Sequence, residues 1–202
     1  MNECSKSIFS KIRDSRYATR YLVGHGIDIG SGADSLALYS EFFPLMKSCR
    51  SWDVADGDAQ EMVGIDDNEL DFVHSSHCLE HLRDPLMALN NWLRILKPGG
   101  HLICLVPDED LYEQETFPSK FNPDHKSTFT IHKKKSWSAA SRNLIDIIVA
   151  ADVPCSLMKI ELQDLTYRYG INEQFGKGQI DQTMTPVGEC SIEFIIRKNL
   201  VD

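Results

Sequence analysis

A short apolar stretch near the start of the chain holds an acid and runs into a glycine-rich turn, residues 26–32 (GIDIGSG). Glycine lets a backbone pass close to a ligand, because a Cβ would occupy the ligand's space. In dinucleotide-binding turns the acid comes about 20 residues later, at the end of the second strand. Here Asp28 stands just before Gly30, so its carboxylate is placed to face a cationic group. The turn therefore disfavours a nicotinamide oxidoreductase and favours a ligand with a positive charge.

A second group of polar residues follows a segment predicted as a strand over residues 70–75. Ser75 and Ser76 end this strand and His77 comes directly after it. Sites in open α/β sheets lie at the carboxyl ends of the strands, so these residues are well placed for a site. His125 lies in a long segment after the next strand. An imidazole with a pKa of about 6.5 accepts a proton near neutrality, so we predict His77 and His125 as candidate catalytic bases.

The stretch from His77 to His81 also matches His-x-x-Glu-His, the inverted zinc-protease motif. That chemistry needs both histidines on one helical face and a further ligand downstream. Here the motif follows a predicted strand with almost no room for a helix, and Pro85 interrupts it soon after. We therefore expect neither a metalloprotease nor a metal site, and we interpret His81 as a structural histidine.

The hydrophobic patterns predict the elements that position these residues. Strands are expected over residues 23–29, 48–54, 70–75, 101–106, 156–162 and 190–197. Helices are expected over residues 5–22, 35–46, 85–96 and 138–151. Strands that alternate with helices imply an α/β fold with a mostly parallel sheet and helices on both faces. The final strand follows a long loop, so we expect it to lie antiparallel to its predecessor.

Two long segments, residues 107–136 and 167–189, show no convincing periodicity. Loops of this length inside a compact domain are usually functional. We therefore expect a single domain over residues 1–202, in which both insertions serve as lid or substrate elements. His125 lies in the first of them, either as a base or substrate clamp or as a lid residue held by turn hydrogen bonds.

Composition narrows the partners. The 202-residue chain carries a net charge of −9, whereas nucleic-acid binding proteins show a basic footprint, so we expect no nucleic acid. Six cysteines without a CxxC spacing are typical of a reduced, cytoplasmic protein. The N-terminal residues lack the apolar region of a signal peptide, and no apolar run approaches the ~20 residues that a membrane span needs. A small acceptor molecule is the partner that these features favour.

Three motifs stand in a fixed order along the chain. They are Asp28-Ile29-Gly30-Ser31-Gly32, Gly57-Asp58-Ala59-Gln60 and Leu96-Lys97-Pro98-Gly99-Gly100-His101-Leu102, with the strand and histidine segment of residues 70–82 before the last. Together they resemble the class I S-adenosylmethionine-dependent methyltransferases, in particular the type-11 group, with their Rossmann-like fold. The chain also resembles a bacterial subgroup whose genes are often associated with surface-polysaccharide and glycosyltransferase genes. The resemblance covers about residues 21–198.

The resemblance implies a cofactor site for S-adenosylmethionine and for its product S-adenosylhomocysteine. Asp28 would lie under the ammonium of the methionine half, and the turn would contact that half. Asp53 would accept hydrogen bonds from the ribose diol, since a carboxylate offers two oxygens. Asp58 and Ala59 would bind the adenine, and Trp52 is either a cover for the adenine or a core residue. The implied cofactor-binding set is Asp28, Gly30, Ser31, Gly32, Trp52, Asp53, Asp58, Ala59, Ser75 and Ser76.

Two departures from the family pattern stand out. Asp34 replaces the third glycine of the usual turn. Asp53 and Asp58 lie only five residues apart, where a helix and a strand usually separate the two acids. Either Asp53 or Asp56 can therefore be the ribose ligand.

The resemblance implies methyl transfer to a small-molecule acceptor, with a sugar or glycan as the class that the subgroup indicates. The alternative is a cofactor-binding or scaffold protein without catalysis. The sequence does not decide the oligomeric state.

Overall fold

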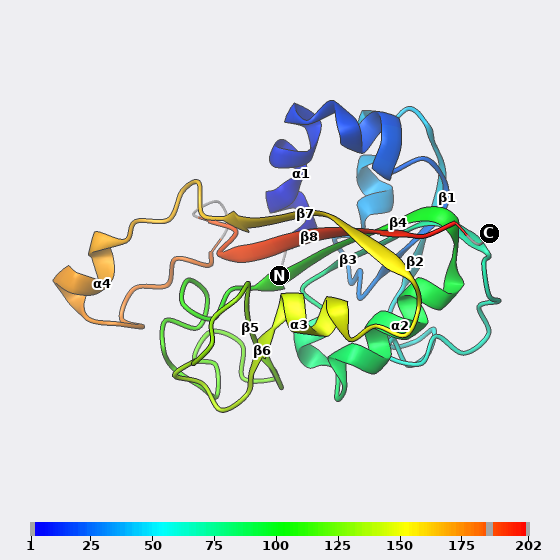
Figure 1. Cartoon of the computed structure of the whole chain (residues 1–202). Helices are drawn as coiled ribbons and strands as arrows, with labels where there is room; N and C mark the ends of the chain where they lie inside the picture. Colours follow the sequence, from blue (N-terminus) through cyan, green and yellow to red (C-terminus); the bar gives the residue numbers. More distant parts are fainter. Residues whose placement is uncertain (1–2, 185–187, 201–202) are drawn as a thin grey trace.

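The computed structural model describes residues 3–184 and 188–200, which fold around a six-stranded sheet (Figure 1). Its strand order is β2-β1-β3-β4-β8-β7. The strands are β1 (Gly24–Ile29), β2 (Met46–Trp52), β3 (Leu70–Ser76), β4 (Leu96–Pro107), β7 (Cys155–Gln163) and β8 (Ser191–Lys198). The first four are parallel, and β8 lies antiparallel to both β4 and β7. This confirms the predicted α/β Rossmann-like class and the antiparallel final strand.

Helices cover both faces of the sheet (Figure 1). On one face lie α1 (Glu3–Arg13), the π-helical turn η1 (Tyr17–Tyr21) and the 3-10 helix η2 (Leu36–Phe42), over a cluster that includes Tyr17, Leu36 and Phe72. On the other lie α2 (Pro85–Ile95) and α3 (Leu144–Val149), over a larger cluster around Trp92. A sheet with apolar side chains on both faces is stable only when both faces are covered, as here.

Local capping explains where several helices begin. The Asp84 carboxylate accepts hydrogen bonds from the first backbone amides of α2, and Pro85 occupies the first turn, as the sequence predicts. The predicted helix over 138–151 begins only at Leu144, because the Asn143 side chain caps it and residues 141–143 form strand β6.

The two N-terminal helices also differ from the prediction. The helix expected over 5–22 ends at Arg13, and a separate π-helical turn follows it. The helix expected over 35–46 is shortened to the 3-10 helix η2. Residues 53–69, between β2 and β3, hold neither a helix nor a strand, which agrees with the shortened spacing between the two acids.

The first long segment, 107–136, packs against the end of the sheet. It contains β5 (Thr128–Thr130), which pairs in parallel with β6 (Ser141–Asn143). The amides of Lys126 and Ser127 both donate to the Glu80 carbonyl, which ties the segment to the turn after β3. The second long segment contains the short helix α4 (Gly170–Phe175), which lies away from the sheet (Figure 1).

Two further features bear on the sequence expectations. All six cysteines lie within the described ranges and are free thiols. In residues 3–184 and 188–200, no helix combines the length and apolar character that a membrane crossing requires.

Candidate functional site

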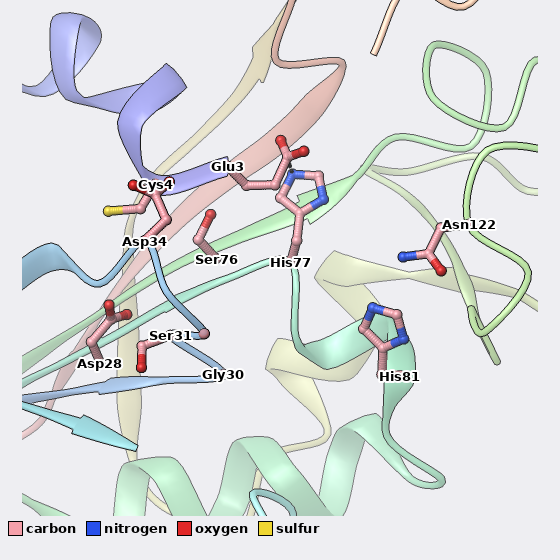
Figure 2. A pocket seen from close by; sticks show the side chains of 11 residues that line it. Glu3, Cys4, Asp28, Gly30, Ser31, Asp34, Ser76, His77, His81 and Asn122 are labelled. Carbon is pink, nitrogen blue, oxygen red and sulfur yellow. Dashed lines mark ion pairs between the residues drawn. The ribbon is translucent and has the colours of Figure 1, made fainter. Parts of the chain in front are cut away.

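Two adjoining cavities lie at the carboxyl ends of β1, β2 and β3, where an open α/β sheet places its ligands. The first has a volume of about 220 Å³ and the second about 750 Å³, and Gly30, His77 and His81 line both. The first is also lined by Glu3, Cys4, Asp28, Ser31, Gly32, Asp34, Ser76 and Asn122, most of them drawn in Figure 2. The second is also lined by Asp53, Val54, Gly57, Asp58, Ala59, Gln60, Cys78, Leu82, Arg83, Asp124 and Lys126. Together they form one elongated site with the glycine turn at its middle.

The two glycines of the turn lie in different surroundings. Both have a positive φ, +73° at Gly30 and +51° at Gly32, which glycine adopts without strain. A Cβ on Gly30 would lie 2.5 Å from the Cys78 Cβ, so this position is closed by packing inside the protein. A Cβ on Gly32 would meet no atom of the described residues within 4 Å. The open space beside the turn is therefore at Gly32.

Asp28 lies under the turn and is buried, with 1% of its surface exposed. One carboxylate oxygen lies 2.6 Å from Nδ1 of His74, a histidine that is itself fully buried on β3. The other oxygen accepts a hydrogen bond of 2.7 Å from the Leu36 amide at the start of η2. Through its two oxygens, Asp28 on β1 is thus linked to β3 and to η2.

Three carboxylates line the first cavity: those of Glu3, Asp28 and Asp34. Asp34 accepts hydrogen bonds from the Ser5 amide and the Tyr39 hydroxyl, which join it to α1 and η2. Asp34 is the residue that replaces the third glycine of the family turn, so the substitution adds an acid to the cavity wall. Such a wall favours a ligand group with positive charge.

Asp53 and Asp58 both line the second cavity. Asp53 follows the end of β2, whereas the Asp56 carboxylate turns back to accept a hydrogen bond from the Asp53 amide. Asp58 accepts hydrogen bonds from the Gln60 amide and from Arg83, both at 2.8 Å, and the hydrogen bond from Gln60 is the main contact that lowers its carboxyl pKa. One oxygen of Asp58 therefore lies in an ion pair at the cavity rim.

The neighbouring tryptophans hold this loop in place. Trp52 has 2% of its surface exposed and belongs to the core cluster, with the Arg50 guanidinium 4.9 Å from its ring centre. Its burial favours the core reading over a cover for an adenine. Trp92, fully buried on α2, donates a hydrogen bond of 2.8 Å to the Ala59 carbonyl. The Ala59 carbonyl is therefore engaged by α2, while Ala59 itself lines the second cavity.

The serines after β3 have separate positions. Ser75 is fully buried and donates to the Ile29 carbonyl at 3.0 Å, so it links β3 to β1 inside the sheet. Ser76 lines the first cavity, and its buried hydroxyl has no hydrogen-bond partner among the described residues. The Ser31 hydroxyl in the turn is in the same state. Two buried hydroxyls beside a cavity are available to a ligand.

His77 lies between the two cavities, with a left-handed backbone (φ +54°) that turns the chain sharply after β3. Its Nε2 lies 3.6 Å from a Glu3 oxygen, the pair drawn in Figure 2, and its Nδ1 lies 3.5 Å from a Glu80 oxygen. Burial lowers the pKa of His77 to about 4, which keeps the imidazole neutral at pH 7. The lowered pKa also makes this imidazole a weaker base than a free one, so a role in catalysis would depend on its position at the cavity wall.

His125 has 4% of its surface exposed and lies behind the cavity wall, not on an exposed loop. Its Nδ1 is 2.6 Å from a Glu113 oxygen. The Tyr112 ring packs between the two candidate bases, with its centre 5.7 Å from that of His77 and 5.2 Å from that of His125. The structure thus brings both predicted histidines into one cluster, although they come from segments 48 residues apart.

Several residues of this site escape sequence reasoning. Glu3 and Asp34 reach it from α1 and the turn, and Glu80, Glu113 and Asn122 reach it from the segments around the histidines. Only the His-x-x-Glu-His spacing marks Glu80 in the sequence. That stretch forms the short 3-10 helix η3 (Leu79–His81), which does not offer the α-helical face that an inverted zinc protease needs.

Residues 13–153 match the family model described as "Methyltransferase domain". Over 58 residues the chain is 36% identical to an uncharacterized methyltransferase of Schizosaccharomyces pombe, and over 59 residues it is 37% identical to the demethylmenaquinone methyltransferase of Staphylococcus carnosus. Each segment covers 29% of this chain, but only 20% and 24% of the respective relative.

The fold extends further than these short matches. The crystal structure of the YcgJ protein of Bacillus subtilis superposes with a TM-score of 0.58 at 14% sequence identity, over 98% of this chain and 100% of that one. At this identity the likeness concerns the fold alone.

Proposed function

The chain belongs to the family of methyltransferase domains, and from this premise we propose that it transfers a methyl group from S-adenosylmethionine to a small acceptor. The observation that carries the proposal is the elongated site at the ends of β1, β2 and β3, with an acidic half and a larger half on either side of the glycine turn. The acceptor class we propose is a sugar or glycan, which rests on the resemblance to the polysaccharide-associated subgroup.

The residues present fit this cofactor. The three carboxylates of the first cavity suit the cationic methionine half, and the free space at Gly32 lets the turn approach it. Ser31 and Ser76 offer hydroxyls that have no hydrogen-bond partner within residues 3–184 and 188–200. In this proposal, bound S-adenosylmethionine supplies a methyl group activated by a sulfonium.

The second cavity fits the adenosine half. Asp53 follows the end of β2 and lines the cavity, and we propose it as the ribose ligand in preference to Asp56, which is turned toward the backbone. Ala59 and the remaining oxygen capacity of Asp58 would face the adenine. Trp52 and Ser75 then support the site from the core instead of touching the cofactor.

The chain's own residues would hold the acceptor atom in line with the methyl group and, for a hydroxyl acceptor, remove its proton. Positioning of two reactants supplies about 7–11 kcal/mol of the barrier in favourable cases. For a hydroxyl acceptor, we propose His77 as the proton acceptor, since its imidazole borders both cavities. We propose that His125 holds the cluster behind it, and that the insertions 107–136 and 167–189 contact the acceptor.

A binding experiment followed by a turnover experiment tests this function. Calorimetry with S-adenosylhomocysteine is expected to show one site on the full chain, with no binding of NAD. Turnover is measured as S-adenosylhomocysteine formed from S-adenosylmethionine in the presence of a panel of sugars and glycan fragments. Binding of NAD without S-adenosylhomocysteine would overturn the proposal, and cofactor binding without turnover on any acceptor would favour the non-catalytic alternative.

A further inference from the structure

A buried carboxylate behind the cavity wall faces three imidazoles. Glu80 has no exposed surface, and neither of its carboxylate oxygens has a hydrogen-bond partner among the described residues. Around its Oε1 lie Nδ1 of His77 at 3.5 Å, Nε2 of His81 at 3.8 Å and Nε2 of His125 at 3.8 Å. The ligand atoms of Glu80, His81 and His125 all lie within 4.8 Å of one another.

These distances do not describe hydrogen bonds. A nitrogen that donates to an oxygen lies at 2.7–3.2 Å, so a proton does not link these imidazoles to Glu80. They are close instead to the spacing of ligands around a metal ion. With metal–ligand bonds of about 2.0–2.1 Å in tetrahedral geometry, two ligand atoms lie about 3.4 Å apart. A small inward movement of each side chain would bring the atoms of this cluster to that spacing.

The outer ring nitrogens strengthen this reading. Nδ1 of His125 lies 2.6 Å from a Glu113 oxygen, and Nδ1 of His81 lies 3.0 Å from an Asp124 oxygen. Such contacts hold the proton on Nδ1 and leave the Nε2 lone pair free, as in histidines that ligate metals. Two lone pairs and a carboxylate oxygen therefore converge on one small space, an arrangement that a cation between them would stabilise.

The other charged groups around the cluster include two carboxylates and two lysines. Glu3 lies 3.6 Å from His77, and Glu113 lies 2.6 Å from His125, so further carboxylates surround the cluster. The lysines nearby are engaged elsewhere: Lys6 pairs with Glu3 at 2.9 Å, and Lys126 donates to the His81 carbonyl. Among the described residues, neither lysine forms an ion pair with Glu80.

We propose that Glu80, His81 and His125 bind a divalent transition-metal ion, with Zn²⁺ as the best match for two imidazoles and one carboxylate. Three protein ligands leave one coordination position open. His77 and His81 both line the cavities, so the open position lies toward the site, next to Asn122 (Figure 2). The ion would also fasten residues 107–136 to the turn after β3. The sequence alone led us to expect no metal at this motif.

A measurement of bound metal tests this proposal independently of methyl transfer. The full chain, prepared without a histidine tag and stripped with a chelator, is dialysed against Zn²⁺ and its bound metal is measured by mass spectrometry. We expect one Zn²⁺ per chain in the wild type. His81→Gln and His125→Gln, each verified as folded by circular dichroism, are expected to lose most of it. His25→Gln is the matched control, since His25 is an exposed histidine on β1.

A milder variant keeps all three ligands and guards against loss of folding. Glu113→Gln removes only the carboxylate behind His125, and it is expected to weaken Zn²⁺ binding roughly 10–100-fold. A folded wild type that binds no Zn²⁺, or folded His81→Gln and His125→Gln variants that keep one ion per chain, would overturn the proposal.

A second group of potential ligands, Cys4, Asp28 and His74, lies on the other side of the glycine turn and has to be distinguished. Cobalt(II) serves as the probe, because a thiolate ligand adds a strong charge-transfer band in the near ultraviolet. We expect a cobalt spectrum without that band. A cobalt spectrum with that band, abolished by Cys4→Ser but unchanged by His125→Gln, would place the ion in the second group and refute the assignment.

Discussion

Substitution of the two glycines in the turn after β1 is expected to separate folding from ligand binding. A Cβ at Gly30 would lie 2.5 Å from the Cys78 Cβ and 2.7 Å from its Sγ, at a φ of +73°. Overpacking of a core costs about 1–3 kcal/mol, and a left-handed backbone costs a non-glycine residue about 1–2 kcal/mol. Gly30→Ala is therefore expected to lower the free energy of unfolding by about 2–5 kcal/mol, a large part of the total in a typical domain.

Substitution of Gly32 is expected to affect ligand binding and to leave stability nearly unchanged. Its Cβ would enter open space, and its φ of +51° is one that asparagine tolerates better than other side chains. Gly32→Asn is expected to lower the free energy of unfolding by about 1 kcal/mol or less, since asparagine adopts a left-handed backbone at lower cost than other side chains. Its side chain would project into the cavity, so binding of S-adenosylhomocysteine is expected to be lost.

Urea unfolding measures the first effect and calorimetry with S-adenosylhomocysteine measures the second. The two variants act as controls for each other, because they lie two residues apart in the same turn. A Gly30→Ala variant as stable as the wild type would show that the turn does not pack against Cys78. A folded Gly32→Asn variant with unchanged affinity would show that the cofactor does not approach the turn, and would refute the reasoning.

Three further predictions follow from contacts around the site and the sheet. Asp53→Ala is expected to weaken S-adenosylhomocysteine binding by about 1.5–3 kcal/mol, the usual value of hydrogen bonds to a charged group, whereas Asp56→Ala has a smaller effect in calorimetry. Equal losses would contradict our choice of ribose ligand. Burial lowers the pKa of His101 to about 4 in the folded chain, against about 6.5 in the unfolded chain. The unfolded chain therefore binds a proton at a higher pH than the folded chain does, and the free energy of unfolding is expected to fall as the pH drops from about 6.5 to 4. Urea unfolding across this range should show a flatter profile for His101→Gln, and identical profiles would disprove the assignment. Trp92→Phe removes the hydrogen bond to the Ala59 carbonyl and is expected to lower the free energy of unfolding by about 1–3 kcal/mol, with weaker cofactor binding as the loop loosens; unchanged values in denaturation and calorimetry would contradict it.

Local sequence determined the class of the fold and indicated the place of the candidate site. Alternation of strands and helices predicts the sheet, and Pro85 predicts the first residue of α2, which the structure confirms. The glycine turn after an apolar strand predicts where a ligand approaches the backbone. These signals are readable because each depends on residues within one or two turns of the chain.

Helix boundaries near the N-terminus were less predictable. The apolar spacing over residues 5–22 continues past Arg13, but the chain changes to a π-helical turn so that Tyr17 and Tyr21 fill the core. Periodicity describes a face that can be buried, and the packing partner decides where the helix ends.

The chemistry of the site was decided only by the tertiary structure. The sequence predicts that the Asp28 carboxylate faces a ligand. In the structure its two oxygens contact His74 and the Leu36 amide, which are 46 and eight residues away in the chain. Glu80 and His125 meet because residues 107–136 fold back over the end of β3. Such convergence depends on which segment covers which end of the sheet, and local periodicity does not encode it. The burial of these side chains arises from the same long-range packing, so the sequence indicates the residue types and the fold alone determines which groups surround them.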